Sequence, residues 1–503
     1  MPDVSSPPLI ARASEHRGRT AIVDSSGTYT YDQLLDASAR VASALLAGRD
    51  DLAQERVAFL IAPRFDWVAV QWGIWRAGGI AVPLPLGSPA AELGYFVDDA
   101  QPAALVYDAP SARILLPIAA ARGIRAYSCR GMLARQPAPL PAIAGQRRAM
   151  ILYTSGTTSR PKGVVTSHAS VTAQITALAE AWEWSADDRI VLCLPLHHVH
   201  GIINVVSCAL WSGAVCEMLP RFDANAVWDR ISSGAVTLLM AVPTIYVKLI
   251  AAWEAYPPER RTILSEAASR LRLMVSGSAA LPVSTLERWK EITGHTLLER
   301  YGMTEIGMAL SNPYRGKRVP GSVGTTLPGV EARLVAENGE AVRPGTPGEI
   351  EVRGANVFTE YWGKPEATRE AFRDGWFRSG DTAVIENGVY RILGRTNIDI
   401  LKTGGHKVSA LEIEETLREH PAVVECAVVG VPDLEWGERV AAALVLSDGN
   451  ALDLETLRTW AKKRLATYKV PSRLLILEAL PRNAMGKVTK PAVAVLFQAA
   501  SLK

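Results

Sequence analysis

Residues 153–163 read Tyr-Thr-Ser-Gly-Thr-Thr-Ser-Arg-Pro-Lys-Gly and give the first indication of the fold. Five Ser/Thr hydroxyls, two glycines and one lysine lie within eleven positions, directly after the apolar run 149–153. Hydroxyls and exposed backbone N–H groups bind phosphate oxygens, and Lys162 adds a positive charge. The segment is not a Walker A loop, because Pro161 precedes the lysine and Gly163 follows it. The pattern predicts a strand that ends in a phosphate-binding loop.

The sequence around this loop is typical of an α/β fold. Apolar strand-like runs alternate with Ala-rich amphipathic segments, at Arg56–Ile61, Gly79–Pro83 and Ala103–Tyr107. A further strand, Leu271–Val275, also leads into a polar glycine loop, Ser276–Ala279. Ligands bind at the carboxyl ends of strands in open α/β sheets. We therefore expect chemistry at the loops after residues 153 and 275.

The C-terminal part has a different pattern. Short runs separated by Gly and Asp turns, from Gly348–Arg353 to Tyr390–Leu393, predict a β subdomain. We expect a large N-terminal α/β domain over 1–394 and a small α+β domain over 395–503, joined by a hinge at about 394–402. The elements expected in the small domain are helices at Ala410–Glu419 and Leu454–Leu465, strands at Val423–Gly430, Val440–Val445 and Leu474–Leu477, and a turn at Pro432–Gly437.

Composition excludes several classes of protein. The 503 residues contain 54 Lys and Arg against 51 Asp and Glu, a net charge of +3 without a basic tract, so we expect neither a nucleic-acid nor a membrane partner. The N-terminal residues do not resemble a signal peptide, and no run is apolar enough to span a bilayer. The five cysteines form no CxxC pair. We expect a cytoplasmic protein that is a monomer or a weak homodimer.

The loop at 153–163 resembles the phosphate-binding signature of the acyl-adenylating superfamily, which includes acyl-CoA synthetases, adenylation domains and luciferases. Ser159 departs from the glycine that is most common there, and its Cβ disfavours a left-handed backbone. Further segments resemble the other motifs of this superfamily in the same order. They are Tyr301-Gly-Met-Thr-Glu305, Ser379-Gly-Asp381, Gly394-Arg395 and Pro481-Arg-Asn-Ala-Met-Gly-Lys487.

The resemblance implies a two-step reaction: ATP and an acid form an acyl-adenylate, and the thiol of CoA then displaces AMP. It implies that Lys487, Glu305, Thr304 and Lys162 are catalytic and that Glu305 and Thr157 hold Mg²⁺. The ATP site implied by the same motifs comprises Thr154, Ser155, Gly156, Thr157, Thr158, Lys162, Gly277, Ser278, Glu299, Tyr301, Gly302, Thr304, Asp381 and Arg395. Gly404, Gly405 and His406 resemble the CoA tunnel, and the hinge residue lies between Asn397 and Asp399.

The acyl group is indicated by Arg300, directly before the predicted adenine platform Tyr301. An unpaired guanidinium is costly in a pocket for fatty or aryl acids, but it suits a substrate that keeps a second carboxylate. The run Glu299–Glu305 and the segments Leu194–Gly201 and Val275–Pro282 resemble malonyl-CoA synthetases. We therefore expect a malonate:CoA ligase, which can also accept methylmalonate. Its expected acyl pocket comprises Arg300, Lys248, Ser278, His200, His198 and Met303.

Other interpretations remain open at this point. Arg300 can form a structural salt bridge to Glu299 or a nearby acid, Lys248 can be a solvated helix lysine, and His198 and His200 can be packing residues. The protein can then be a synthetase for another short acid, a non-catalytic homologue that binds acyl-adenylates, or an enzyme that loads a separate carrier protein. Malonyl-CoA can serve fatty acid or polyketide synthesis, or malonate breakdown.

Overall fold

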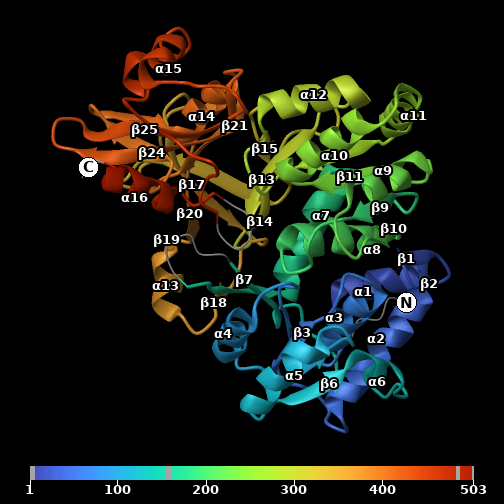
Figure 1. The fold of residues 1–503 in the computed structure, drawn as a ribbon. Coiled ribbons are helices and arrows are strands. Elements are labelled where there is room, and N and C mark those ends of the chain that lie inside the picture. The colour runs from blue at the N-terminus through green and yellow to red at the C-terminus, as the bar shows by residue number, and fades with distance from the viewer. Residues whose placement is uncertain (1–5, 155–159, 483–487, 501–503) are drawn as a thin grey trace. The chain divides into compact units, whose positions relative to one another are not determined.

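The computed structural model describes residues 6–154, 160–482 and 488–500. The chain forms two compact units, of which unit 1 comprises 1–331 and 352–377, and unit 2 comprises 332–351 and 378–503 (Figure 1). These limits differ from the predicted boundary at 394. The limits fall within two strands, β17 (Gly348–Gly354) and β20 (Trp376–Glu386), so each of these strands has one end in each unit. The predicted functional boundary stays a prediction.

One sheet of unit 1 has nine strands, in the order β15-β14-β13-β12-β11-β9-β10-β1-β2. The strands from β13 to β1 are parallel to their neighbours, and the outer pairs are antiparallel. Their bounds are β1 Thr20–Asp24, β2 Gly27–Thr30, β9 Arg189–Leu192, β10 Val215–Met218, β11 Leu238–Ala241, β12 Leu273–Ser276, β13 Leu298–Met303, β14 Gly307–Ser311 and β15 Thr325–Thr326.

The second sheet of unit 1 has seven strands, in the order β18-β8-β7-β4-β3-β5-β6. A short antiparallel pair, Phe372–Arg373 with Trp376–Phe377, also lies in unit 1. The predicted strands at 56–61, 79–83, 103–107 and 149–153 are confirmed with ends shifted by one residue at most. The bounds are β3 Arg56–Leu60, β4 Ile80–Pro83, β5 Ala104–Tyr107, β6 Arg125–Ser128, β7 Arg148–Tyr153, β8 Gly163–Ser167 and β18 Glu360–Tyr361.

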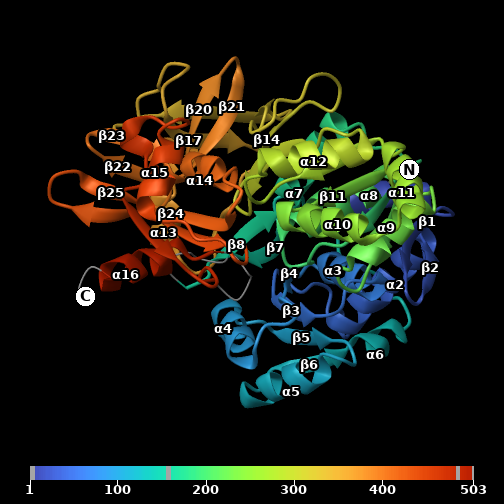
Figure 2. The same cartoon turned by 45° about the horizontal axis from the view of Figure 1, so that its top comes forward.

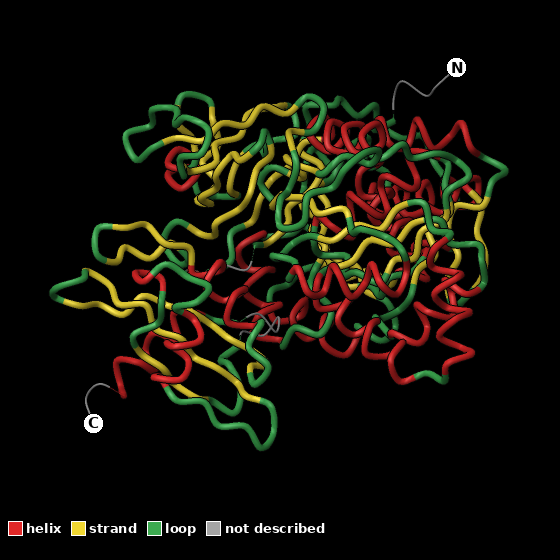
Figure 3. The backbone as a smooth tube through the Cα atoms, turned by 90° about the horizontal axis from the view of Figure 1, so that it is seen from above, coloured by secondary structure: helices red, strands yellow, loops and turns green. Residues whose placement is uncertain are grey.

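Helices flank both sheets, as Figure 3 shows with red tubes on either side of yellow strands. In Figures 1 and 2 helices α9 to α12 gather beside β11. Trp228 of α9 and Trp289 of α12 are buried, and their rings stack with centroids 5.6 Å apart. The bounds are α1 Pro8–Ala13, α2 Tyr31–Leu46, α3 Phe65–Arg76, α4 Ala90–Ala100, α5 Ala112–Ala121, α6 Cys129–Leu133, α7 His168–Ala181, α8 Cys208–Ser212, α9 Ala224–Ser232, α10 Pro243–Ala255, α11 Pro258–Ser269, α12 Val283–Thr293 and α13 Pro365–Glu370, with a π-helix over His200–Ser207. Within the described ranges, no helix combines the length and apolarity needed to cross a bilayer.

Unit 2 contains most of a sheet ordered β16-β17-β20-β19, with β21 beside β20, and all of a sheet ordered β23-β22-β25-β24, with β26 beside β25. The bounds are β16 Val330–Val335, β17 Gly348–Gly354, β19 Phe372–Arg373, β20 Trp376–Glu386, β21 Val389–Arg395, β22 Ile400–Thr403, β23 His406–Ser409, β24 Val423–Asp433, β25 Gly437–Leu446, β26 Arg473–Ile476, α14 Ala410–Arg418, α15 Leu454–Ala461 and α16 Lys490–Ala500.

Two predicted boundaries in unit 2 are wrong. The turn is shorter than Pro432–Gly437, because β24 continues to Asp433 and pairs there with Gly437. The ion pair between Arg439 and Asp433 closes this hairpin. Helix α15 ends at Ala461, four residues before the predicted end at Leu465. The N–H groups of Arg464 and Leu465 both donate to the Ala461 carbonyl, and the chain turns there.

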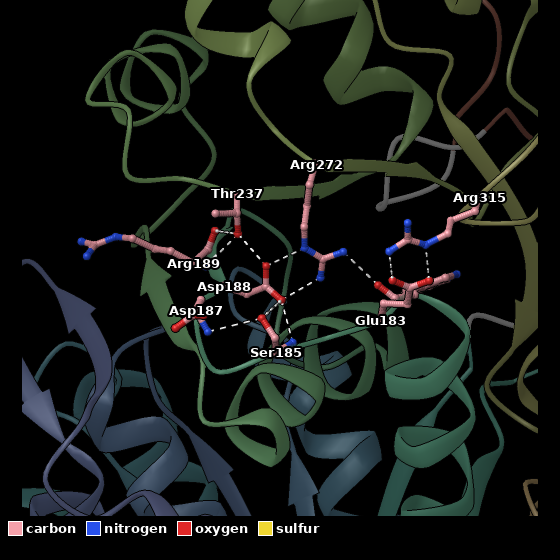
Figure 4. Close-up of polar contacts among 9 residues, drawn as sticks. Glu183, Ser185, Asp187, Asp188, Arg189, Thr237, Arg272 and Arg315 are labelled. Carbon is pink, nitrogen blue, oxygen red and sulfur yellow. Dashed lines mark hydrogen bonds and ion pairs between the residues drawn. The ribbon is translucent and has the colours of Figure 1, made fainter.

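One buried carboxylate fixes the amino ends of three neighbouring strands in the nine-stranded sheet (Figure 4). Asp188, just before β9, accepts hydrogen bonds from Arg272 Nε and Nη2 at 2.6 and 2.7 Å. Thr237, just before β11, donates its hydroxyl to Asp188 Oδ1 at 2.9 Å. Because Arg272 directly precedes β12, this one side chain ties β9, β11 and β12 together. The opposite, carboxyl end of β12 leads into the candidate site.

We predict that Asp188→Asn destabilises unit 1. The change leaves the guanidinium of Arg272 without its counter-ion, and breaking a largely buried pair of this kind costs about 3 kcal/mol. Urea unfolding followed by tryptophan fluorescence measures the loss. The control is Glu183→Gln, because Glu183 pairs with Arg315 at the surface, where the arginine side chain is 78% exposed (Figure 4). Equal unfolding midpoints for both variants would contradict the role of Asp188.

Candidate active site

The register of β12 and β13 places the predicted acyl residues together. The two strands run parallel and pair Ser276 with Glu299, so the loop after β12 lies beside the next residue of β13. Gly277 and Ser278 therefore face Arg300. A Cβ added at Gly277 would lie 2.4 Å from Arg300 Cζ, so glycine is needed there for the guanidinium to occupy its position.

Arg300 is a buried cation without a carboxylate partner. The residue is 3% exposed, and its Nη2 lies 3.4 Å from Ser278 Oγ. Among the described residues, its Nε has no hydrogen-bond partner and no Asp or Glu forms an ion pair with it. Burial lowers the pKa of Arg300, because desolvation penalises its charged form. The alternative of a salt bridge to Glu299 is therefore wrong within the described part of the chain.

Ser278 and His200 form a polar cluster with Arg300. Ser278 has a left-handed backbone with φ of +70°, a conformation that is rare for serine and is often found at functional sites. Its Oγ lies 3.3 Å from His200 Nδ1. His200 is buried, and its pKa falls well below the ordinary value through desolvation first and the charge of Arg300 second. A neutral His200 beside a charged Arg300 suits an anionic ligand.

Asn204 is a polar residue of this region that the sequence analysis missed. It lies four positions after His200 in the same π-helix, and π-helical turns occur frequently at functional sites. Asn204 is fully buried, and neither its Oδ1 nor its Nδ2 has a hydrogen-bond partner among the described residues. A lone Asn within the apolar run Ile202–Val206 was the signal in the sequence. A buried amide of this kind requires a ligand or an ordered water.

The surroundings of the other three predicted pocket residues do not point to a role in binding. Lys248 is exposed on α10, and its Nζ lies 5.8 Å from the centroid of the Phe222 ring. The His198 ring packs against His197 with centroids 4.2 Å apart. Met303, at the end of β13, is half-buried. Their place in the acyl pocket stays a prediction.

Five of the predicted nucleotide residues of unit 1 lie in β13 or in the turn after it. Tyr301 and Gly302 are half-buried in this strand, and Glu299 Oε1 accepts a hydrogen bond from the Gly321 N–H at 2.9 Å. Thr304 and Glu305 lie in the turn between β13 and β14. Glu305 is buried, and its Oε1 accepts a hydrogen bond from the Tyr361 hydroxyl at 2.9 Å.

Oxygen donors of this kind fit Mg²⁺. The carboxylate of Glu305 is a hard ligand, and Mg²⁺ in nucleotide sites takes only one or two protein ligands beside phosphates and water. The second predicted ligand, Thr157, lies outside the described residues. Among the described residues, no group of three or more His, Cys, Asp or Glu could hold a metal by itself. Glu305 would thus hold the ion together with the nucleotide.

The described ends of the phosphate loop are fixed by hydrogen bonds. The Thr154 N–H donates to the Lys162 carbonyl at 3.0 Å, and the Tyr95 hydroxyl donates to the Pro161 carbonyl at 2.7 Å. The Lys162 ammonium lies 4.9 Å from the centroid of the Tyr361 ring. The predicted residues Ser155, Gly156, Thr157 and Thr158, the unusual Ser159 and the catalytic Lys487 lie outside the described residues.

Unit 2 carries the remaining predicted residues. Asp381 and Arg395 pair across β20 and β21, and Arg395 Nε lies 2.9 Å from Asp381 Oδ1. Gly404 and Gly405 have φ of +54° and +78° in the turn between β22 and β23. A Cβ at Gly404 would lie 3.0 Å from the Trp436 ring, so this loop is closely packed on one side. The His406 ring stacks on Tyr468 with centroids 4.2 Å apart.

Comparisons with known proteins identify the family of this chain. The family described as AMP-binding enzyme matches residues 9–362, and the AMP-binding enzyme C-terminal domain matches residues 412–487. The chain is 46% identical to the mouse (Mus musculus) mitochondrial malonate–CoA ligase ACSF3, over 96% of this chain and 89% of that protein. It is 40% identical to the malonate–CoA ligase of Arabidopsis thaliana, over 95% and 86%. The ATP-bound crystal structure of MatB from Rhodopseudomonas palustris superposes with a TM-score of 0.90, 35% identity and coverage of 98% and 99%.

The unpaired state of Arg300 has a consequence for stability. We predict that Arg300→Met raises the unfolding free energy of the ligand-free protein by about 1 kcal/mol or more, because an apolar side chain of similar length replaces a desolvated cation. Thermal unfolding without ligand measures the change. Arg272→Met is the matched control, and it should destabilise because it removes a cation that Asp188 pairs. Destabilisation of equal size in both variants would identify Arg300 as a structural ion-pair partner.

Proposed function

This chain belongs to the AMP-binding enzyme family, and from that premise we propose that it is a malonate:CoA ligase. It joins malonate to ATP as malonyl-adenylate and then transfers the malonyl group to the thiol of CoA. Methylmalonate is a second candidate substrate, because one added methyl group changes binding in an apolar pocket by only about 1–3 kcal/mol.

The observation that carries the proposal is the buried guanidinium of Arg300, which has no counter-ion among the residues that the structure describes. Malonate keeps one carboxylate after the other is activated, and this distal carboxylate can supply the missing charge and accept the unused N–H donors. A monocarboxylate would leave the cation desolvated and unpaired, which is strongly unfavourable. Ser278 and His200 extend the same polar cluster.

The first step brings two anions together. A carboxylate oxygen of malonate attacks the α-phosphorus of ATP, the bond to the β-phosphate oxygen breaks, and pyrophosphate leaves. We assign Lys162 and Lys487 to neutralising the charge that accumulates on the phosphate oxygens. Glu305 would hold Mg²⁺, which would supply further positive charge at the phosphate oxygens. We assign the Tyr301 ring to stacking on adenine, and the Asp381 carboxylate to accepting hydrogen bonds from the ribose hydroxyls.

The second step needs no protein nucleophile. The CoA thiol attacks the carbonyl carbon of the mixed anhydride, the bond to the phosphate oxygen breaks, and AMP leaves. The left-handed glycines Gly404 and Gly405 allow the pantetheine chain to approach the backbone closely. We retain the hinge between Asn397 and Asp399 as a proposal, and likewise a monomeric or weakly dimeric state. Cytoplasmic location also stays a proposal, whereas the mouse relative is named as mitochondrial.

A panel of acids tests the assignment. With ATP, Mg²⁺ and CoA, we expect malonate to give the highest kcat/KM among malonate, acetate, butyrate and octanoate, measured as AMP release. In Arg300→Met the value for malonate should fall about 100-fold, because loss of one partner of a buried charge pair costs roughly 2–5 kcal/mol, while butyrate changes little. Lys248→Met tests the second predicted cation in the same way. Faster turnover of a monocarboxylate by the wild type would refute the assignment.

Gly277→Ala probes the position of the guanidinium rather than its charge. The added Cβ meets only the mobile end of the Arg300 side chain, so the protein should fold while the guanidinium moves. We expect KM for malonate to rise about tenfold or more, since a displacement of an ångström disrupts a charged hydrogen bond, with KM for ATP nearly unchanged. Gly18→Ala is the control, because its Cβ would have no atom within 4 Å. An equal rise of KM for malonate in both variants would contradict the geometry.

A further inference from the structure

Tyr361 contacts two residues of opposite charge that the nucleotide site needs. Its hydroxyl donates a hydrogen bond to Glu305 Oε1 at 2.9 Å, and its ring centroid lies 4.9 Å from Lys162 Nζ. The three residues come from distant parts of the chain within unit 1. Neither the motifs of the sequence nor the comparisons assign Tyr361 a role.

The position of Tyr361 is fixed from several sides. Strand β18 pairs antiparallel with β8, and Tyr361 lies opposite Val164, two residues after Lys162. The Tyr361 N–H donates to the Thr368 hydroxyl at 3.0 Å, and its ring packs on Phe358 with centroids 4.8 Å apart. The side chain is nearly buried, at 8% exposure. The N–H of Phe358 in turn donates to the Glu305 carbonyl at 2.7 Å, so the same segment supports the loop that carries the carboxylate.

A tyrosine can serve both charges because its two ends differ. The hydroxyl is a hydrogen-bond donor suited to a carboxylate, and the ring face attracts an ammonium ion. Among the described residues, the Lys162 ammonium forms no ion pair, and it makes a cation–π contact with the Tyr361 ring. Without a group between them, an ammonium and a carboxylate at the two ends of one site attract each other and would neutralise the charges that ATP and Mg²⁺ require.

We propose that Tyr361 is a positioning residue for the ATP half-reaction: it holds the Lys162 ammonium and the Glu305 carboxylate at separate places and prevents a direct ion pair between them before the nucleotide binds. The inference rests on the ATP-dependent part of the proposed function and does not depend on which acid is the substrate. Lys162 remains available for phosphate oxygens, and Glu305 remains available for the ion that accompanies ATP.

Two substitutions separate the two contacts. Tyr361→Phe keeps the ring beneath Lys162 and removes the donor to Glu305, whereas Tyr361→Leu removes both. Isothermal titration without any acid should give a Kd for MgATP that is about tenfold weaker in Tyr361→Phe. We expect a further loss of about fivefold in Tyr361→Leu. With ATP and EDTA, Tyr361→Phe should bind like the wild type, because its contact with Lys162 is intact, and only Tyr361→Leu should be weaker.

Tyr31→Phe is the matched control. Tyr31 is a fully buried tyrosine of unit 1, and its hydroxyl donates to the Ala214 carbonyl at 2.7 Å. Its loss should lower the melting midpoint and leave Kd for MgATP unchanged. If Tyr361→Leu does not fold, Tyr361→Phe carries the test through the comparison of MgATP with metal-free ATP.

Several outcomes overturn the proposal. A wild-type Kd for MgATP in Tyr361→Phe would overturn it, as would an equal loss of MgATP and metal-free ATP binding, because a merely structural tyrosine would affect both. A wild type without measurable MgATP binding would overturn it together with the proposed function. A wild type that binds MgATP but fails to turn over malonate would contradict only the choice of acid, and the graded series would still support the role of Tyr361.

Discussion

The guanidinium of Arg300 is 3% exposed and receives no carboxylate from the described protein, and this constraint organises the rest of the acyl site. The parallel register of β12 and β13 places it against Gly277, the one residue type without a Cβ to obstruct it. The Asp188 cluster holds the amino ends of β9, β11 and β12, and so supports that register from the opposite edge of the sheet. The favourable ion pair of Arg300 therefore forms only when a ligand with a second negative charge binds.

In the nucleotide site, an aromatic residue contacts two groups of opposite charge. Lys162 and Glu305 have opposite charges and serve one ligand, so each must remain available until that ligand arrives. Tyr361 contacts both through different atoms, and its strand β18 is fixed on β8 directly beyond the phosphate loop. Among the described residues, neither Arg300 in the acyl site nor Lys162 in the nucleotide site forms an ion pair with a carboxylate. Arg300 and Lys162 can therefore bind anions.

The sequence predicted the parts of the structure that depend on local pattern. Alternating apolar runs predicted β3, β4, β5 and β7 within one residue, and the polar glycine loops after residues 153 and 275 predicted sites at the ends of β7 and β12. Relations set by distant pairing were not predictable. The role of Tyr361 depends on β18 lying beside β8, almost 200 residues earlier in the chain. The unsatisfied amide of Asn204 and the shortened hairpin at Asp433 likewise depend on tertiary packing and strand register.

The central claim is that Arg300 is completed by the distal carboxylate of the substrate. Its most direct test is the affinity for two stable analogues of the acyl-adenylate, malonyl-sulfamoyladenosine and butyryl-sulfamoyladenosine, which differ only in that distal group. Isothermal titration should give a dissociation constant at least about 100-fold lower for the malonyl analogue, because the butyryl group leaves a buried cation unpaired. Equal affinity for the two analogues would contradict the account.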